Sequence, residues 1–266
     1  MILEDLANST RSRIEAEMKD FSSEKARLQA ESIAAAEKHL RGFAYPFEAA
    51  LKAPGLSIIS EVKKASPSKG VIAEEFPFLE IAKEYEAAGA DAISCLTEPE
   101  RFKGSDEYLK AITREVSIPV LRKDFTVDPY MIYQAKLFGA SAVLLIAAIL
   151  SDSELKEYFE TADSLGLSCL FEAHDGEEVE RCLAAGARIV GVNNRNLKDF
   201  TVDITNSIRL RDRVPKDIIF VSESGIMTPA DVKALYDNGT DAVLIGEMLM
   251  RSPDKTGLIR ELKNAD

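Results

Sequence analysis

Four similar segments recur along the chain: AAGADAI (Ala87–Ile93), LFGASAV (Leu137–Val143), AAGARIV (Ala184–Val190) and DNGTDAV (Asp237–Val243). In each of them a glycine comes three residues before an apolar run. A glycine just past the last turn of a helix adopts the left-handed conformation that ends the helix. We therefore predict a helix end followed by a strand at each site. The copies lie about 50 residues apart, roughly twice the length of one βα unit.

Further apolar runs lie before the first of these segments and between them. They are SIISEVKK (Ser57–Lys64), VLRKDF (Val120–Phe125), LSCLFEAH (Leu167–His174) and IIFVSESG (Ile218–Gly225). Continuously apolar strands that alternate with helices are typical of a parallel sheet buried on both faces. The eight units predict an α/β fold, a (β/α)8 TIM barrel. The competing doubly wound sheet is disfavoured, because its GxGxxG turn does not occur in the sequence.

Residues 1–50 do not follow the repeat. They contain the charged helical runs SRIEAEMKDF (Ser12–Phe21) and SEKARLQAESIAAAEKHL (Ser23–Leu40). We interpret them as two extra helices packed on the barrel, within a single domain spanning residues 1–266, since they are too short and too polar to form a core of their own. Two roles stay open for this N-terminal helical extension: a solvated hairpin, or a cover for the active site.

The charge balance restricts the partners of the protein. Subtracting 45 acidic from 33 basic residues gives a formal net charge of −12. This charge repels nucleic-acid backbones and anionic membranes, so we expect neither as a partner. An anionic small substrate remains compatible with it, because a few cations and backbone N–H groups in a cleft reverse the local field.

Cysteine usage and the N-terminal segment indicate a cytoplasmic protein. The cysteines Cys95, Cys169 and Cys182 form no CxxC pair, and two of them lie in predicted strands, so we expect buried, reduced thiols. The opening MILEDLANS has no basic region followed by an apolar one, as a secretory signal would. The longest apolar run, Ala142–Leu150, is far shorter than the roughly 20 residues that span a bilayer.

Charged and amide side chains stand at the ends of the predicted strands. In TIM barrels the C-terminal strand ends supply the active site. An isolated Lys or Glu is usually a solvated surface residue, but so many at strand ends predict carboxylates and cations that converge on an anionic substrate for acid–base chemistry. These side chains are Glu61, Lys63, Lys123, Glu172, Asn193, Arg195, Glu223 and Glu247.

A phosphate site is predicted separately from the last two strands. Ser224-Gly225 follows the seventh strand and Gly246-Glu247 follows the eighth. These two loops commonly bind phosphate through backbone N–H groups in this fold. The alternative is that both glycines serve only tight turns.

Other catalytic patterns are absent from the sequence. With His39 and His174 as the two histidines, no zinc-ligand spacing exists, and there is no P-loop or GxSxG. For His174 we expect a packing or helix N-terminal role, although it could form a hydrogen bond in the site. We therefore expect chemistry without a metal or an organic cofactor.

The strings EVKKASPSKG, VLRKDFTVDPY, GVNNRNLKDFTVD, SESGI and LIGEMLM resemble the motif set of the indole-3-glycerol phosphate synthases. The similarity runs from about Ile2 to the C-terminus, with the motifs in the family's order. It implies a carboxy-lyase of tryptophan biosynthesis. Such an enzyme closes the ring of 1-(2-carboxyphenylamino)-1-deoxyribulose 5-phosphate, with decarboxylation and dehydration. It also implies a phosphorylated small-molecule substrate and a monomer or weak homodimer.

The resemblance assigns catalytic roles residue by residue. It implies that Lys123 is the general acid that protonates the substrate ketone and that Glu172 is a general base. Glu61 and Lys63 match a second acid–base pair, in which Lys63 also neutralises the carboxylate or phosphate of the substrate. Glu223 matches a further polar group of the site.

The resemblance also assigns substrate contacts. Asn193 and Arg195 match groups that hold the hydroxyls and the carboxylate. The implied phosphate binders are Ser66, Ser224, Gly225, Gly246 and Glu247, and the implied apolar walls for the aromatic ring are Phe125 and Leu144.

Two positions depart from the family's common pattern: Ala173 stands where a valine more often follows the glutamate, and Met248 replaces a small residue. Both changes affect pocket shape alone. Two other readings remain open. One is a different phosphate-binding barrel, such as a sugar-phosphate isomerase or a Schiff-base aldolase with Lys123 as nucleophile. The other is a catalytically silent scaffold barrel, which would be expected to lack several of the matched groups.

Overall fold

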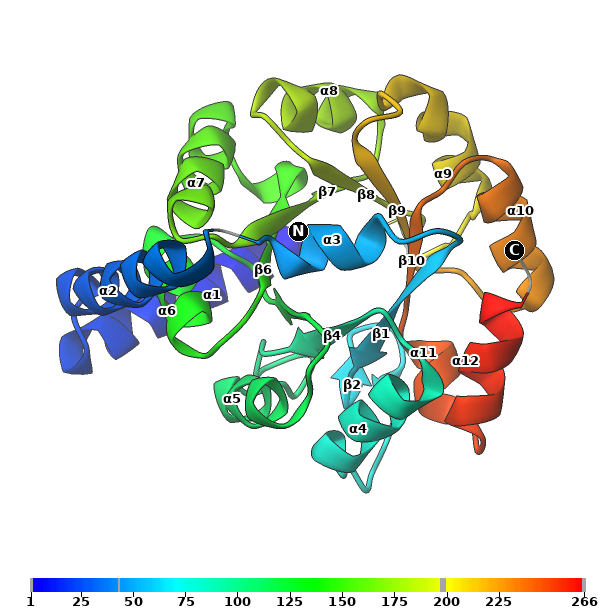
Figure 1. The fold of residues 1–266 in the computed structure, drawn as a ribbon, viewed down its shortest axis with the longest axis horizontal. Coiled ribbons are helices and arrows are strands. Elements are labelled where there is room, and N and C mark those ends of the chain that lie inside the picture. The colour runs from blue at the N-terminus through cyan, green and yellow to red at the C-terminus, as the bar shows by residue number, and fades with distance from the viewer. Residues whose placement is uncertain (1, 43, 197–199, 265–266) are drawn as a thin grey trace.

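The computed structural model describes residues 2–42, 44–196 and 200–264. Within them, parallel strands close into a barrel in the order β1-β10-β9-β8-β7-β6-β5-β4, which confirms the predicted TIM barrel (Figure 1). The strands of the barrel are β1 (Ser57–Val62), β4 (Ala92–Leu96), β5 (Val120–Lys123), β6 (Ala142–Ile146), β7 (Ser168–Ala173), β8 (Ile189–Asn193), β9 (Ile219–Glu223) and β10 (Ala242–Ile245).

Helices follow the strands and surround the barrel (Figure 1). They are α4 (Phe78–Ala88), α5 (Asp106–Glu115), α6 (Pro129–Leu137), α7 (Asp152–Ser164), α8 (Gly176–Ala184), α9 (Thr205–Leu210), α10 (Pro229–Asp237), α11 (Glu247–Arg251) and α12 (Lys255–Lys263). Short 3-10 turns, η1 (Ala147–Ile149) and η2 (Arg211–Arg213), and a small hairpin of β2 (Ala65–Ser66) and β3 (Gly70–Val71) complete the connections.

The repeated glycines end helices as predicted. Gly89, Gly139, Gly186 and Gly239 have φ angles between 82° and 98°, the left-handed region that a side chain would disfavour. Each chain segment then turns directly into the next barrel strand. The glycines therefore mark every second βα unit of the fold.

The barrel interior is filled by the inward-facing side chains of the strands. Ile59, Leu121, Leu170, Ile189 and Ile219 are buried together there, with small alanines from alternate strands. A second, larger core lies between the strands and the helices. Two buried layers of this kind explain why the strands read as continuously apolar.

Three helices precede the first strand, although we predicted two. They are α1 (Ile2–Asp20), α2 (Ser23–Arg41) and α3 (Pro46–Leu51). The unpredicted α3 lies across the N-terminal end of the barrel, in front in Figure 1, and buries Phe47 and Leu51 against the inner layer. A helix of six residues is too short to show an amphipathic period, so the sequence pattern missed it.

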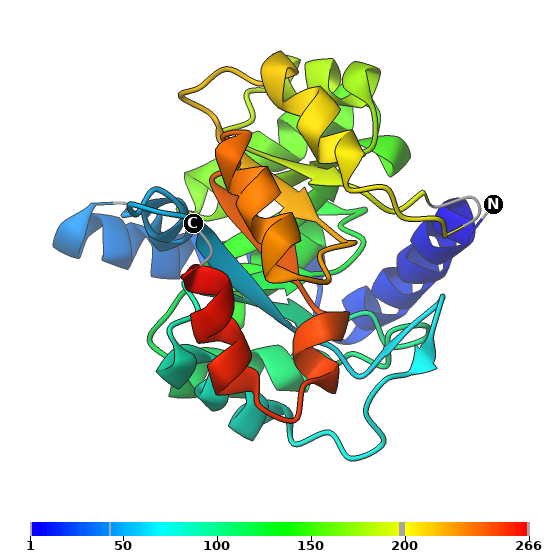
Figure 2. The ribbon, with the colours of Figure 1, turned by 90° about the vertical axis from the view of Figure 1, so that its right-hand side faces the viewer.

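The other two N-terminal helices occupy different places. Helix α2 packs on α6. Helix α1 lies toward the C-terminal end of the barrel, on the side of the β2–β3 hairpin (Figure 2). Leu6 and Ala7 of α1 are buried in the same core as Phe125 and Leu144. Helix α1 is therefore placed to cover the barrel mouth.

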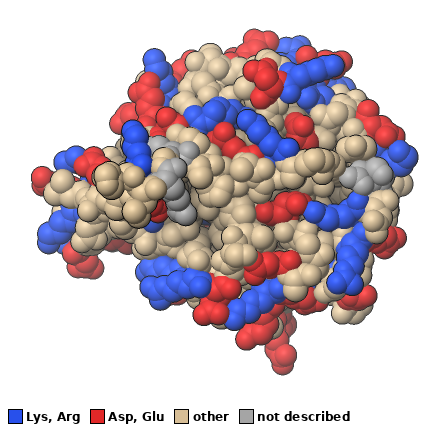
Figure 3. Space-filling model, viewed as in Figure 1, with Lys and Arg blue, Asp and Glu red and all other residues tan. Residues whose placement is uncertain are grey.

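The surface and the thiols agree with the sequence. Figure 3 shows acidic and basic side chains mixed over the face that α3 crosses. Cys95, Cys169 and Cys182 are buried thiols, as expected, and burial raises the pKa of each. No helix among the described residues combines the length and apolar character needed to cross a membrane.

Candidate active site

A cavity of about 620 Å³ opens at the C-terminal end of the barrel. The strand ends of β1, β5, β7, β8, β9 and β10 all contribute to its wall. Every residue that the sequence assigned to the site lines this cavity, namely Glu61, Lys63, Ser66, Lys123, Phe125, Leu144, Glu172, Asn193, Arg195, Glu223, Ser224, Gly225, Gly246 and Glu247. The structure thus brings the predicted set together in one place.

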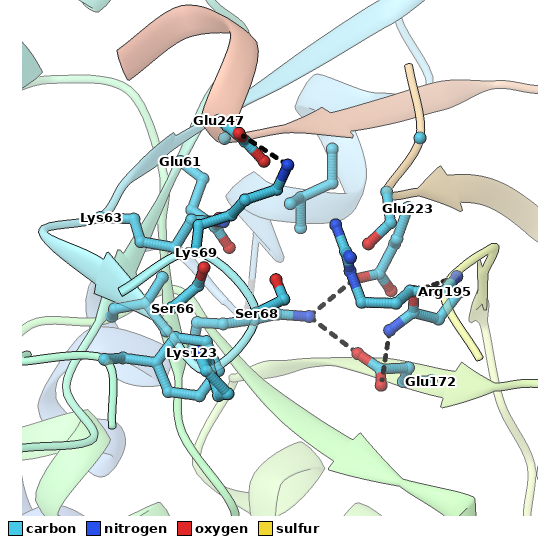
Figure 4. Close-up of a pocket in the computed structure, with 18 of the residues that line it drawn as sticks. Glu61, Lys63, Ser66, Ser68, Lys69, Lys123, Glu172, Arg195, Glu223 and Glu247 are labelled. Atoms are coloured by element: carbon cyan, nitrogen blue, oxygen red, sulfur yellow. Dashed lines mark hydrogen bonds and ion pairs between the residues drawn. The ribbon is translucent and has the colours of Figure 1, made fainter. Parts of the chain in front are cut away.

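Lys123 lies between two carboxylates that belong to other strands. Its Nζ is 2.9 Å from Glu172 Oε2 and 2.6 Å from Glu223 Oε2 (Figure 4). All three side chains are largely buried, with exposed fractions of 13%, 5% and 2%. Lys123 and Glu223 are the last residues of β5 and β9, and Glu172 is the second-last residue of β7. The register of these parallel strands therefore brings the three side chains together.

The protonation states of this cluster differ from those of free side chains. Burial would lower the pKa of Lys123, but Glu172 and Glu223 outweigh it and raise the pKa. Burial would raise the pKa of Glu172, yet Lys123 and His174 bring it below its usual range. Burial, together with the charge of Glu172, raises the pKa of Glu223 despite the same lysine. The pKa values of the two neighbouring carboxyl groups therefore lie far apart, which is the arrangement that general acid–base catalysis uses.

The second oxygen of Glu172 has partners of its own. Asn193 Nδ2 donates to Glu172 Oε1 at 3.2 Å, and His174 Nε2 lies 3.5 Å from the same oxygen. Asn193 Oδ1 in turn accepts the backbone N–H of Arg195 at 3.0 Å. His174 has the expected place just before α8, but its ring also faces the site.

Glu61 and Lys63 form a direct ion pair at the end of β1. Gly246 lies next to them: a Cβ there would overlap the Glu61 carboxylate and lie 2.7 Å from Lys63 Nζ. The glycine is therefore required for the close approach of β10 to this pair. The need for a glycine at position 246 thus has a cause in side-chain packing, in addition to the tight turn considered from the sequence.

The loop after β9 has a constrained backbone. Ser224 and Gly225 have φ angles of 67° and 80°. The buried Asn194 side chain donates to the Ser224 carbonyl and to the Ser222 hydroxyl, both at 3.0 Å. Its Oδ1 accepts from the backbone and the hydroxyl of Ser207. This network holds the Ser224-Gly225 backbone in one conformation, so its N–H groups are preorganised.

The side chain of Glu247 is paired with cations and is not itself suited to bind a phosphate. Its Oε1 lies 3.1 Å from Arg251 Nε. The same oxygen lies 3.6 Å from Lys69 Nζ (Figure 4). A carboxylate repels phosphate, whereas the backbone N–H of Glu247, at the start of α11, is available to an anion. Lys69, which the sequence analysis did not select, comes from the hairpin tip and lines the same part of the cavity.

The apolar wall includes residues that the sequence did not reveal. Phe125 and Leu144 are accompanied by Phe102, Leu3 and Leu6. The Phe102 and Phe125 rings are 6.3 Å apart. An i, i+3 apolar pair on α1 was a weak signal for the two leucines, because any amphipathic helix shows such spacing.

Phe102 is positioned by a buried carboxylate. Glu98 accepts the backbone N–H groups of residues 100, 101 and 102 at 2.8–2.9 Å. The Phe102 carbonyl then accepts the N–H of Ala65 at 3.2 Å, which joins this loop to the β2–β3 hairpin. Two loops of the rim are thus tied together.

The closed parallel barrel and the buried lysine–glutamate cluster define a TIM barrel with a charged site at the C-terminal ends of its strands. Solved structures support the fold. The chain resembles 3-hexulose-6-phosphate synthase from Salmonella typhimurium (TM-score 0.66, 15% identity, 79% of this chain and 98% of that one). It also resembles thiamine phosphate pyrophosphorylase from Pyrococcus furiosus (TM-score 0.61, 18% identity, 82% and 96%).

Sequence comparison identifies the family. The family model for indole-3-glycerol phosphate synthase matches residues 3–262. The chain is 57% identical to the indole-3-glycerol phosphate synthase of Ruminiclostridium cellulolyticum, over the full length of both proteins. It is 51% identical to the protein of the same name from Lacticaseibacillus paracasei, over 99% of each. The chain belongs to the indole-3-glycerol phosphate synthase family, the carboxy-lyases of tryptophan biosynthesis with EC number 4.1.1.48. The family resemblance seen in the motifs is confirmed.

Proposed function

We propose that the lysine–glutamate cluster carries out ring closure, decarboxylation and dehydration of 1-(2-carboxyphenylamino)-1-deoxyribulose 5-phosphate. The observation that supports this most is the position of Lys123 between Glu172 and Glu223. Bond formation at the ketone places negative charge on its oxygen, and a fully charged ammonium at that point stabilises the oxyanion and donates its proton.

Lys123 acts as the general acid and not as a nucleophile. Schiff-base formation requires a neutral amine, whereas the two carboxylates raise the pKa of Lys123. This argues against the aldolase alternative. The ionised Glu172 is suited to accept the proton lost as the indole ring becomes aromatic, because its pKa is lowered.

Glu223 and the Glu61–Lys63 pair complete the acid–base set. A carboxyl whose pKa is raised can hold a proton near neutral pH, so Glu223 can return the proton that Lys123 donates. Lys63, paired with Glu61 on the opposite side of the cavity, neutralises the substrate carboxylate or phosphate and assists the loss of the hydroxyl.

Asn193, Arg195 and the rim loops hold the substrate in its folded shape. Asn193 and Arg195 are linked by a hydrogen bond, so they act together on the hydroxyls and the carboxylate. The phosphate is bound by the backbone at Ser224, Gly225, Gly246 and Glu247 and by Ser66, which lines the same cavity. Phe125 and Leu144 hold the aromatic ring. Anchoring both ends makes the closing carbon atoms neighbours, which removes much of the entropic barrier.

The whole chain acts as one domain, because Leu3 and Leu6 of the N-terminal helix are part of the cavity wall.

We place the enzyme in the cytoplasm, in keeping with its buried thiols. We expect it to be a monomer or a weak homodimer. Helix α2 exposes three apolar side chains, Leu28, Ile33 and Leu40. A patch of this size supports weak self-association at most. Sedimentation velocity over a range of concentrations measures this directly.

The direct test is indole formation by the purified protein. The chain contains no tryptophan, so a growing indole emission reports product alone. We expect the signal from protein and substrate without added metal or nucleotide, and an unchanged rate with chelator, since lysine and glutamate side chains suffice for each proton transfer. A dephosphorylated analogue is expected to react far more slowly. Folded protein that forms no indole under these conditions would refute the proposal.

A further inference from the structure

His174 links the catalytic cluster to helix α8. Its ring Nδ1 lies 3.0 Å from Glu178 Oε2, and its Nε2 lies 3.5 Å from Glu172 Oε1. Nε2 is buried and has no hydrogen-bond partner among the described residues. One ring nitrogen is therefore fixed by a carboxylate outside the cavity while the other faces a carboxylate inside it.

The local backbone holds this arrangement. Glu178 Oε2 also accepts the backbone N–H of His174 at 2.7 Å, and the N-cap Asp175 accepts the N–H of Glu178 at 2.9 Å. From the other side, Asn206 donates to the His174 carbonyl at 3.0 Å. The first turn of α8 thus determines the direction of the imidazole ring.

We propose that His174 is a positioning residue for Glu172: its imidazolium, oriented by Glu178, holds Oε1 of the general base ionised and directed toward the substrate. Lys123 binds the other oxygen, so Glu172 is held at both oxygens. This inference rests on the proposed role of Glu172 as the base. It extends the site by two residues, His174 and Glu178, that do not line the cavity.

The charges around the ring favour its protonated form. The groups that face it are Glu178 from α8, Glu172 from β7 and Glu223 from β9, with Lys123 beyond Glu172. Burial would lower the pKa of His174, but the hydrogen bond to Glu178 and the charges of the glutamates raise it above its usual value. The effect is reciprocal, and the imidazolium contributes to the lowered pKa of Glu172.

A purely structural histidine would behave differently. If His174 only capped α8, its removal would lower activity equally at every pH. A positioning imidazolium instead loses its effect as it is deprotonated, so catalysis should depend on its own titration. The two roles are therefore separable by comparing a pH profile with a directly measured pKa.

The first experiment is a histidine NMR titration. The chain has two histidines, and His39 on the exposed side of α2 serves as the internal reference; His39→Asn assigns the resonances. We expect His174 to titrate above 6.5, and its midpoint to fall by about one pH unit or more in Glu178→Gln and in Glu172→Gln. Glu177→Gln, an exposed neighbour on the same turn, is the matched control and should leave it unchanged.

The second experiment compares kinetics with the titration. In Glu178→Gln we expect kcat to fall about fivefold above the lowered His174 midpoint, with KM nearly unchanged, because neither residue lines the cavity. The alkaline limb of kcat should move together with the NMR midpoint. His174→Gln, whose amide can still donate to Glu172, should retain more activity than His174→Leu.

The outcomes separate this inference from the proposed function. If Glu172→Gln abolishes turnover but leaves the His174 titration unchanged, the positioning role is wrong and the proposed base survives. If Glu172→Gln stays active while the titration shifts, the assigned base is wrong. A pH-independent loss in Glu178→Gln, or a His174 midpoint below 6.5 in the unmodified protein, overturns the inference.

Discussion

The Nζ atom of Lys123 lies 2.6 Å from Oε2 of Glu223, although 100 positions separate the two residues in the chain. The pair spans the mouth of the barrel from β5 to β9. A buried ion pair of this kind costs desolvation that its own attraction repays only in part. Its presence at the centre of the cavity therefore points to catalysis as the reason for it, and the mutations below separate catalytic from structural effects.

Lys123→Met is expected to abolish turnover while the barrel remains folded. Methionine replaces the stem of the lysine but supplies no proton for ring closure. Glu223 can take up a proton in its place, which limits the charge left buried. We expect kcat/KM to fall by far more than tenfold, with a native circular dichroism spectrum. Lys156→Met, on the surface of α7, is the control; retention of a tenth of the activity in Lys123→Met would contradict the assigned role.

Glu223→Gln is expected to lower activity and to increase stability at high pH. Burial and Glu172 raise the pKa of Glu223. Between the usual glutamate pKa and this raised value the folded protein binds more protons than the unfolded chain, so its stability falls as pH rises through that window. Glutamine does not titrate, so the variant should not lose stability in this pH window.

Urea unfolding at pH 5 and pH 8 measures the effect. The midpoint of Glu223→Gln, relative to that of the unmodified protein, should be higher at pH 8 than at pH 5. Glu157→Gln, on the exposed side of α7, should show no such trend. A relative midpoint that declines with pH would show that Glu223 is stabilised as a carboxylate.

Ser224→Asp tests the phosphate loops. The new carboxylate would stand beside the backbone N–H groups at Ser224 and Gly225, where it repels a phosphate. The anchor is used equally in the ground and transition states, so KM should rise far more than kcat falls. Ser164→Asp, exposed on α7, introduces the same charge away from the cavity. A large fall in kcat at constant KM would place Ser224 in the chemistry instead.

Arg13→Met tests whether α1 is part of the site. Arg13 Nη2 lies 2.9 Å from the fully buried Asp124, which follows Lys123 directly. Loss of this ion pair should cost about 1–3 kcal/mol of docking energy. The cavity wall formed by Leu3 and Leu6 should then loosen, so we expect a KM several-fold higher with a smaller change in kcat. Arg11→Met on the same helix, where Arg11 bonds only a neighbouring asparagine among its described partners, is the control. Unchanged KM in Arg13→Met would mean that α1 has no influence on binding and would favour the solvated hairpin over a cover for the active site.

The barrel and the side on which its chemistry occurs were predictable from sequence for a local reason. Four helix ends are marked by a glycine and each barrel strand by its own apolar run, so these units are recognisable without knowledge of their neighbours. All strands of a barrel are parallel, so the residues at their C-terminal ends must meet at one mouth. Glu61, Lys123, Glu172 and Glu223 were found on this basis and lie in one cavity.

Contacts between distant segments were decided by tertiary structure. The docking of Leu3 and Leu6, the ring direction of His174 and the closure of the barrel base by α3 depend on which surfaces meet once the barrel is closed. A leucine on an amphipathic helix and a histidine before a helix look alike whether they serve a site or merely pack. The order of residues along the chain therefore determined which groups reach the mouth of the barrel. Register and closure alone determined which of them touch, because angstrom distances across a barrel are set by the packing of all its strands together.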